Sequence, residues 1–124
     1  YLPHNYTHNC VVYTGTHDND TVMGWYGTLK GADKKLCDDY LRLKNADGEP
    51  IPREQLPWEF VRAAMSSVAD LAIIPMQDYL GLGSEARINI PSTLGINWKW
   101  RMGNGDFTKE LAGRIRSMTK LYGR

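Results

Sequence analysis

The chain has 124 residues, of which 42% are hydrophobic and 23% charged, and its formal net charge is +1. This composition excludes disordered and fibrous classes, and the length predicts one domain over residues 1–124 with no separate second domain. No apolar run approaches the ~18 residues that a membrane span needs, so we expect no membrane partner.

The first expected element is a short buried strand at residues 10–15 (CVVYTG). Its β-branched and aromatic residues are bounded by polar residues and glycine. A polar loop follows, and it contains THDND at residues 16–20. In TVMGWYG, residues 21–27, two glycines limit any helix to about one turn.

Two helices are expected next, separated by the turn-rich connector NADGEPIP at residues 45–52. Asp33 is the expected N-cap of the first helix, which should end near Asn45. Pro57 suits the first position of the second helix. The expected apolar stripes are Leu36, Cys37, Tyr40 and Leu41 on the first helix, and Phe60, Val61, Ala64, Met65 and Val68 on the second.

The continuous apolar run LAIIP, residues 71–75, predicts a second strand that is fully buried. A glycine-punctuated segment then extends to Asp106. Thr108 is placed to cap a last helix with Leu111, Ile115, Met118 and Tyr122 at helical spacing. From Lys99 onward there are seven Lys or Arg residues against two acidic ones. Because no recognisable nucleic-acid-binding module accompanies these charges, we interpret them as a solvated helix face and expect no nucleic-acid partner.

This order of elements is typical of consecutive βα units with parallel strands, so we predict an α/β fold. In such units, functional residues collect in the loops at the carboxyl ends of the strands. THDND and MQDYLGLG, residues 76–83, both follow a predicted strand. We therefore expect a site there.

Spacing alone does not assign a chemistry to THDND. Adjacent His17 and Asp18 do not easily reach one metal ion, and Val22 interrupts any calcium-type series of oxygen ligands, so we predict no metal. No signature supports Thr14 or Thr16 as a nucleophile. From these residues alone, the favoured interpretation is a capped polar turn.

Only two cysteines are present, Cys10 and Cys37, which is too few for a disulfide-stapled scaffold. Nothing around either thiol marks a depressed pKa, so both are expected to be small apolar fillers. With reduced thiols and no visible secretion signal, we expect a cytoplasmic protein. The chain begins without methionine, and we expect it to be a piece of a longer protein.

Four segments carry a family resemblance: LPHNY (residues 2–6), VVYTGTHDNDT (11–21), SVADLAIIPMQDYLGLGSEARINIP (67–91) and NWKWR (97–101). In this order they closely resemble the C-terminal part of the 4-alpha-glucanotransferases. This is glycoside hydrolase family 77, called amylomaltase in bacteria and disproportionating enzyme in plants. Only residues 30–57 lack distinctive motifs.

The resemblance implies a (β/α)8 TIM barrel, of which this chain would be about the last two βα units, with strands seven and eight. It also implies transfer of a segment of an α-1,4-glucan or maltooligosaccharide to a glucose or maltooligosaccharide acceptor, without a cofactor. The implied mechanism is retaining double displacement, which needs a nucleophile and an acid/base carboxylate about 5 Å apart.

The resemblance also implies roles for individual residues. His17 and Asp18 match a His-Asp pair of the family in which the Asp stabilises the transition state and the His binds hydroxyls of the same sugar. Asn89 matches a substrate-binding position in a motif close to R-x-N-x-P-G, although Ser92 stands where glycine is common. The nucleophile and the acid/base belong to segments that this chain does not contain.

The fragment alone is therefore expected to be inactive, and to self-associate through its open strand edges. The alternative is a non-catalytic carbohydrate-binding or assembly module that keeps the same fold. Arg87 and Arg101 are expected to pin the long loop through ion pairs, and Gln77 and Asp78 to make structural hydrogen bonds. Trp98 and Trp100 are placed on one side of an extended segment, where they could stack on sugar rings or be buried.

Overall fold

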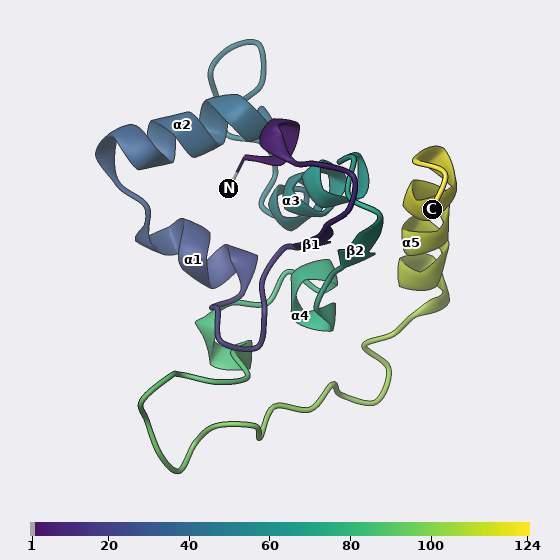
Figure 1. Cartoon of the computed structure of the whole chain (residues 1–124). Helices are drawn as coiled ribbons and strands as arrows, with labels where there is room; N and C mark the ends of the chain where they lie inside the picture. The colour runs from purple at the N-terminus through teal and green to yellow at the C-terminus, as the bar shows by residue number, and fades with distance from the viewer. Residues whose placement is uncertain (1) are drawn as a thin grey trace.

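The computed structural model describes residues 2–124, and Figure 1 shows a small α/β arrangement followed by a long loop and a last helix. Its elements in chain order are η1 (Pro3–Asn5), β1 (Val11–Tyr13), α1 (Val22–Thr28), α2 (Gly31–Leu41), α3 (Leu56–Met65), β2 (Leu71–Ile73), α4 (Met76–Tyr79), η2 (Ser84–Ala86) and α5 (Lys109–Leu121).

The two strands pair in parallel, with Val12 opposite Ala72 at the centre of the register. Helices α1 to α3 connect them, as a parallel pair requires. The predicted order of βα units is therefore confirmed. Both strands end at the same edge of the sheet, so the loop after β1 and the segment after β2 begin side by side.

The two faces of this sheet differ in burial. Val12 packs against Ala64 of α3 and Ala69, and it is buried. The opposite face carries Val11, Tyr13, Leu71 and Ile73, each between 41% and 52% exposed. The prediction that β2 is fully buried is therefore wrong for this chain, because the described residues cover only one face of the sheet. We call the other face, made of these four side chains, the open sheet face.

Two predicted helix boundaries are also wrong. Helix α2 begins after Lys30, which makes no side-chain capping bond, so Asp33 lies in the first turn and does not cap it. The helix ends at Leu41, since Arg42 adopts a left-handed conformation with φ of 56°. The Leu43 amide then donates to the Asp38 carbonyl oxygen at 2.8 Å, which closes the helix four residues before Asn45.

The packing of α3 against α5 confirms the predicted stripe of α5 and only part of that of α3. Trp58, Val61 and Met65 form a buried cluster against which Leu111, Ile115, Met118 and Tyr122 of α5 pack. Pro57 is the second helical residue, one position later than predicted. Val68 lies beyond the end of α3 and is exposed, so its place on the apolar face is not confirmed.

Helix α5 begins as predicted, because the Thr108 side chain accepts a hydrogen bond from the Leu111 amide at 3.1 Å. Its basic residues Arg116 and Lys120 are exposed, which agrees with a solvated helix face. Arg114 lies over the Trp58 ring, 3.8 Å from its centroid. Within residues 2–124, no helix combines the length and apolarity needed to cross a membrane.

Candidate functional site

The THDND sequence lies in the β1–α1 loop, residues 14–21, at the carboxyl end of β1. Asn19 closes its central turn, since Asn19 Oδ1 accepts from the Thr16 amide at 2.8 Å and the Thr16 hydroxyl at 2.9 Å. Thr21 caps α1 by accepting from the Gly24 amide at 3.1 Å.

The three residues proposed from sequence come together. Asn89 Nδ2 donates to Asp18 Oδ1 at 2.6 Å, across 71 positions of the chain. His17 Nε2 lies 3.3 Å from the same oxygen, and the His17 and Asp18 side chains are 55% and 50% exposed. Both of these contacts use Oδ1 of the Asp18 carboxylate.

Asn89 belongs to the long loop, residues 87–108, which passes close to the β1–α1 loop and then leads to α5 (Figure 1). The Arg87 guanidinium joins the two loops. Its Nη2 donates to the Asp18 carbonyl oxygen at 2.7 Å, and its Nε donates to the Asn89 carbonyl oxygen at 2.8 Å. Arg101 Nη1 donates similarly to the carbonyl oxygens of Trp98 and Trp100. The predicted ion pairs are therefore wrong for residues 2–124: Arg87 joins the two loops through carbonyl oxygens, and Arg101 bonds only within the long loop.

Trp98 also reaches the site, a contact that sequence reasoning did not specify. Its ring lies 5.2 Å from the His17 ring, centroid to centroid, at an interplanar angle of 35°. Trp98 has φ of 64°, so the segment is not extended at this residue. The Trp98 amide donates to the Ile88 carbonyl oxygen at 2.7 Å, which closes the loop around Asn89. The sequence indicated only that Trp98 could stack on a sugar ring or be buried.

Ser92 lies in a tight turn of the long loop. The Thr93 amide donates to the Ile90 carbonyl oxygen at 3.3 Å, Pro91 is the second residue, and Ser92 has φ of 65°. A type II turn needs positive φ at this third position, which explains why glycine would be the usual residue there. The substitution leaves the turn in place with a serine in a left-handed conformation.

The segment after β2 forms hydrogen bonds with both ends of the β1–α1 loop. Asp78 is buried, with Oδ2 accepting from the Thr14 hydroxyl at 2.5 Å and Oδ1 accepting from the Val22 amide at 2.9 Å. Burial raises the pKa of the Asp78 carboxyl, and the two hydrogen bonds oppose that effect. Gln77 is also buried and donates to the Ala86 carbonyl oxygen at 3.2 Å. The predicted structural roles of Gln77 and Asp78 are confirmed.

Asp20 connects the β1–α1 loop to η2. Its Oδ2 accepts from the Ser84 hydroxyl at 2.6 Å, and its Oδ1 accepts from the Thr21 amide at 2.8 Å. A side chain at Gly24 would collide with this pair, since its Cβ would lie 2.3 Å from Ser84 Oγ. Asp20 is thus held within the protein, which leaves Asp18 as the accessible carboxylate of the loop.

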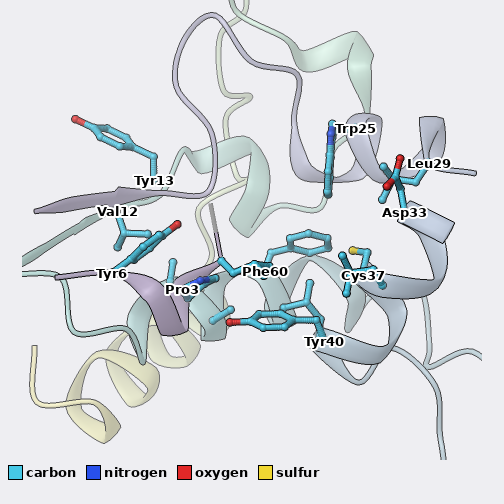
Figure 2. A pocket seen from close by; sticks show the side chains of 15 residues that line it. Pro3, Tyr6, Val12, Tyr13, Trp25, Leu29, Asp33, Cys37, Tyr40 and Phe60 are labelled. Carbon is cyan, nitrogen blue, oxygen red and sulfur yellow. The ribbon is translucent and has the colours of Figure 1, made fainter.

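A groove lined largely by apolar and aromatic side chains lies away from these residues. This groove, of about 460 Å³, lies between the N-terminal segment, β1 and helices α1 to α3. Figure 2 shows its wall of aromatic side chains, which includes Tyr6, Trp25, Tyr40 and Phe60. None of His17, Asp18 and Asn89 lines it.

The remaining titratable groups do not form a metal site. In residues 2–124, no group of three or more His, Cys, Asp or Glu side chains is arranged to hold an ion. Cys10 packs beside the Val12 cluster, and Cys37 beside the cluster of Leu41 and Leu43. Burial raises the pKa of the Cys37 thiol to about 11, which agrees with its predicted role as a filler.

Comparison with known proteins gives one consistent result. Residues 1–107 match the model of a family described as 4-alpha-glucanotransferase. All of the chain aligns with the 4-alpha-glucanotransferase of Clostridium butyricum at 50% identity, and with the chloroplastic/amyloplastic 4-alpha-glucanotransferase DPE1 of Arabidopsis thaliana at 45%. A solved amylomaltase from Streptococcus agalactiae, in complex with acarbose, superposes on 99% of the chain with a TM-score of 0.88 and 34% identity.

The chain corresponds to only part of each of these proteins. It spans 24% of the Clostridium protein, 21% of the Arabidopsis protein and 23% of the solved amylomaltase chain. A partial α/β region of the amylomaltase structure is therefore what the likeness covers.

Proposed function

Since the chain belongs to the 4-alpha-glucanotransferase family, glycoside hydrolase family 77, we propose that the complete protein is a 4-alpha-glucanotransferase. It moves a segment of an α-1,4-glucan or maltooligosaccharide to a glucose or maltooligosaccharide acceptor. The observation that carries this proposal is the family match over residues 1–107, which contain all three candidate site residues. The fold of the complete protein is a (β/α)8 barrel, with β1 and β2 as its last two strands.

Within that reaction, Asp18 stabilises the transition state, and His17 and Asn89 bind the substrate. The geometry supports these roles, because Asn89 and His17 both contact Oδ1 of Asp18, whose side chain is half exposed. A carboxylate fixed in this way accepts hydrogen bonds from sugar hydroxyl groups without reorganising as positive charge develops on the ring.

The chain does not carry the reaction alone. Retaining transfer needs two further carboxylates about 5 Å apart, one as nucleophile and one as acid/base. Asp20 and Asp78 are engaged in hydrogen bonds to the protein, so neither supplies these functions. The 124-residue chain is therefore inactive, and detectable transfer between maltotriose molecules by the purified chain would refute this statement.

The experiment that tests the role of Asp18 is Asp18→Asn in the complete protein. We expect kcat for transfer between maltotriose molecules to fall about 100- to 1000-fold, the usual cost of losing one group that stabilises a transition state. Asp47→Asn, in the exposed turn after α2, is the matched control and should leave kcat within twofold. An unchanged kcat in Asp18→Asn contradicts the assigned role.

The alternative function is a non-catalytic carbohydrate-binding or assembly module. It predicts that the complete protein binds maltooligosaccharides, with no transfer in the wild type. Titration calorimetry beside the transfer assay separates the two functions.

The proposal also covers where the protein is located and how the isolated chain associates. We place the protein in the cytoplasm, where Cys10 and Cys37 stay reduced. In the isolated chain, the open sheet face leads to self-association, because four large apolar side chains face solvent together. In the complete protein, other strands of the barrel cover this face.

A further inference from the structure

The β1–α1 loop is held at both of its ends by a single buried side chain. Thr14 is the first residue of the loop, and Val22 is the first residue after it. The Thr14 hydroxyl and the Val22 amide donate to the two different oxygens of Asp78, at 2.5 Å and 2.9 Å. One carboxylate from the second βα unit thus bridges the entry and the exit of the loop that carries His17 and Asp18.

Asp78 is itself fixed from several directions. It is 1% exposed, and its amide donates to the Pro75 carbonyl oxygen at 3.0 Å, in the first turn of α4 directly after β2. The oxygens of Asp78 therefore have little freedom to follow a moving loop.

The rest of the loop depends on these ends. Asn19 closes the central turn, and the tip is held from the other side by Asn89 and Arg87. Without Asp78, the Val22 amide at the start of α1 would be left without a partner in a buried position. The loop would then be anchored mainly at its exposed tip.

We propose that Asp78 is a positioning residue that clamps both ends of the β1–α1 loop and so fixes Asp18 and His17 for reaction. The catalytic consequence rests on the function proposed above, whereas the clamp itself does not. A displacement of about 1 Å at a reacting group is enough to cost on the order of 100-fold in rate.

The test compares Asp78→Ala with Gln77→Ala in the complete protein. Gln77 is a matched control, because it lies in the same short helix and is equally buried, but its hydrogen bond goes to Ala86 and not to the loop. In Asp78→Ala we expect hydrogen exchange over residues 15–22 to accelerate by on the order of tenfold, and kcat to fall about 100-fold with little change in KM. In Gln77→Ala we expect exchange over residues 15–22 to change less than twofold.

A conservative variant separates positioning from general damage. In Asp78→Asn the side-chain carbonyl still accepts from Val22, and the amide group donates to Thr14 after the hydroxyl rotates. We expect Asp78→Asn to keep kcat within about tenfold of wild type and to restore slow exchange. If Asp78→Ala does not fold, Thr14→Val removes one arm of the clamp only, and Thr14→Ser should restore it.

Three results would overturn the proposal. The first is equal exchange over residues 15–22 in Asp78→Ala and Gln77→Ala. The second is faster exchange over these residues in Asp78→Ala while its kcat stays equal to that of Gln77→Ala. The third is the same exchange rate and the same kcat in Thr14→Val and Thr14→Ser. A wild-type protein without transferase activity would refute the proposed function instead, and exchange alone would then decide the clamp.

Discussion

At the scale of single residues, Ser92 is the clearest case of strain. A non-glycine residue in a left-handed conformation costs about 1 kcal/mol or more, and Ser92 has φ of 65° at the third position of its turn. We expect Ser92→Gly to remove this cost and to stabilise the turn by up to about 1 kcal/mol. Measured by hydrogen exchange, protection of the Thr93 amide should rise up to about fivefold.

Ser92→Ala is the control for this variant. It also removes the hydroxyl group but keeps a Cβ in the left-handed conformation, so it should bring no gain. Equal protection of Thr93 in the glycine and alanine variants would show that the hydroxyl group, and not the backbone, determines the stability of the turn.

Cys37 gives a residue-scale prediction about pH. Burial disfavours its thiolate and raises its pKa to about 11, with the Asp38 carboxylate adding to the effect. In a Cys10→Ser variant, alkylation of Cys37 by iodoacetamide should therefore accelerate about tenfold per pH unit from pH 8 to pH 10. An ordinary thiol with a pKa of about 8.5 would instead level off near pH 9.5. Levelling at that pH would contradict a buried thiol.

At the scale of elements, the two glycines of α1 differ in whether the surrounding structure has room for a side chain. A Cβ at Gly24 would lie 2.3 Å from Ser84 Oγ and 2.6 Å from the Asp20 carboxylate oxygens, whereas a Cβ at Gly27 would meet nothing within 4 Å. We expect Gly24→Ala to lower the free energy of unfolding by about 1–3 kcal/mol, because it separates Asp20 from Ser84. Gly27→Ala should raise it by about 0.5–1 kcal/mol, the gain of alanine over glycine inside a helix.

Urea denaturation of both variants beside the wild type measures this difference. The two changes add the same methyl group to the same helix, so each serves as the control for the other. A loss of stability in both variants would mean that α1 tolerates no side chain on either face.

These glycines also show how far sequence reasoning reaches at this scale. The two glycines predicted about one turn, which is wrong, because α1 has seven residues and its first turn is held by hydrogen bonds to Thr21 and Asp78. The end of α2 at Leu41 depends on the left-handed backbone of Arg42, which its residue type does not signal. The hydrogen bond from the Val22 amide to Asp78 spans 56 positions of the chain, so local periodicity cannot predict it.

In the candidate site too, local motifs predicted some residues, whereas contacts between distant segments bring in the others. His17, Asp18 and Asn89 were predictable because contiguous motifs carry them. Trp98 and Arg87 reach the site through a positive φ and through hydrogen bonds to carbonyl oxygens, and no sequence pattern specifies either. The polar turn that spacing alone favoured is also present, since Asn19 closes it. The interpretation as a family motif and the interpretation as a capped polar turn are therefore compatible for this loop.

At the scale of the whole molecule, the main feature is the open sheet face. The continuous apolar run correctly predicted strand β2, but the prediction that this strand is fully buried is wrong, since Leu71 and Ile73 are 52% and 41% exposed. The register places Leu71 beside Val11 and Ile73 beside Tyr13, so the four side chains form one contiguous patch. Such a patch on a small chain favours association with a second copy.

We expect the isolated 124-residue chain to self-associate through the open sheet face, and the double variant Tyr13→Thr with Ile73→Thr to weaken this association at least tenfold. Threonine keeps the strand propensity of both positions while removing most of their apolar surface. Leu94→Thr is the matched control, because Leu94 is 97% exposed but lies in the long loop away from the sheet. Sedimentation velocity over a range of concentrations measures the association. A monomeric wild-type chain, or an equal effect of Leu94→Thr, would show that the open sheet face does not drive it.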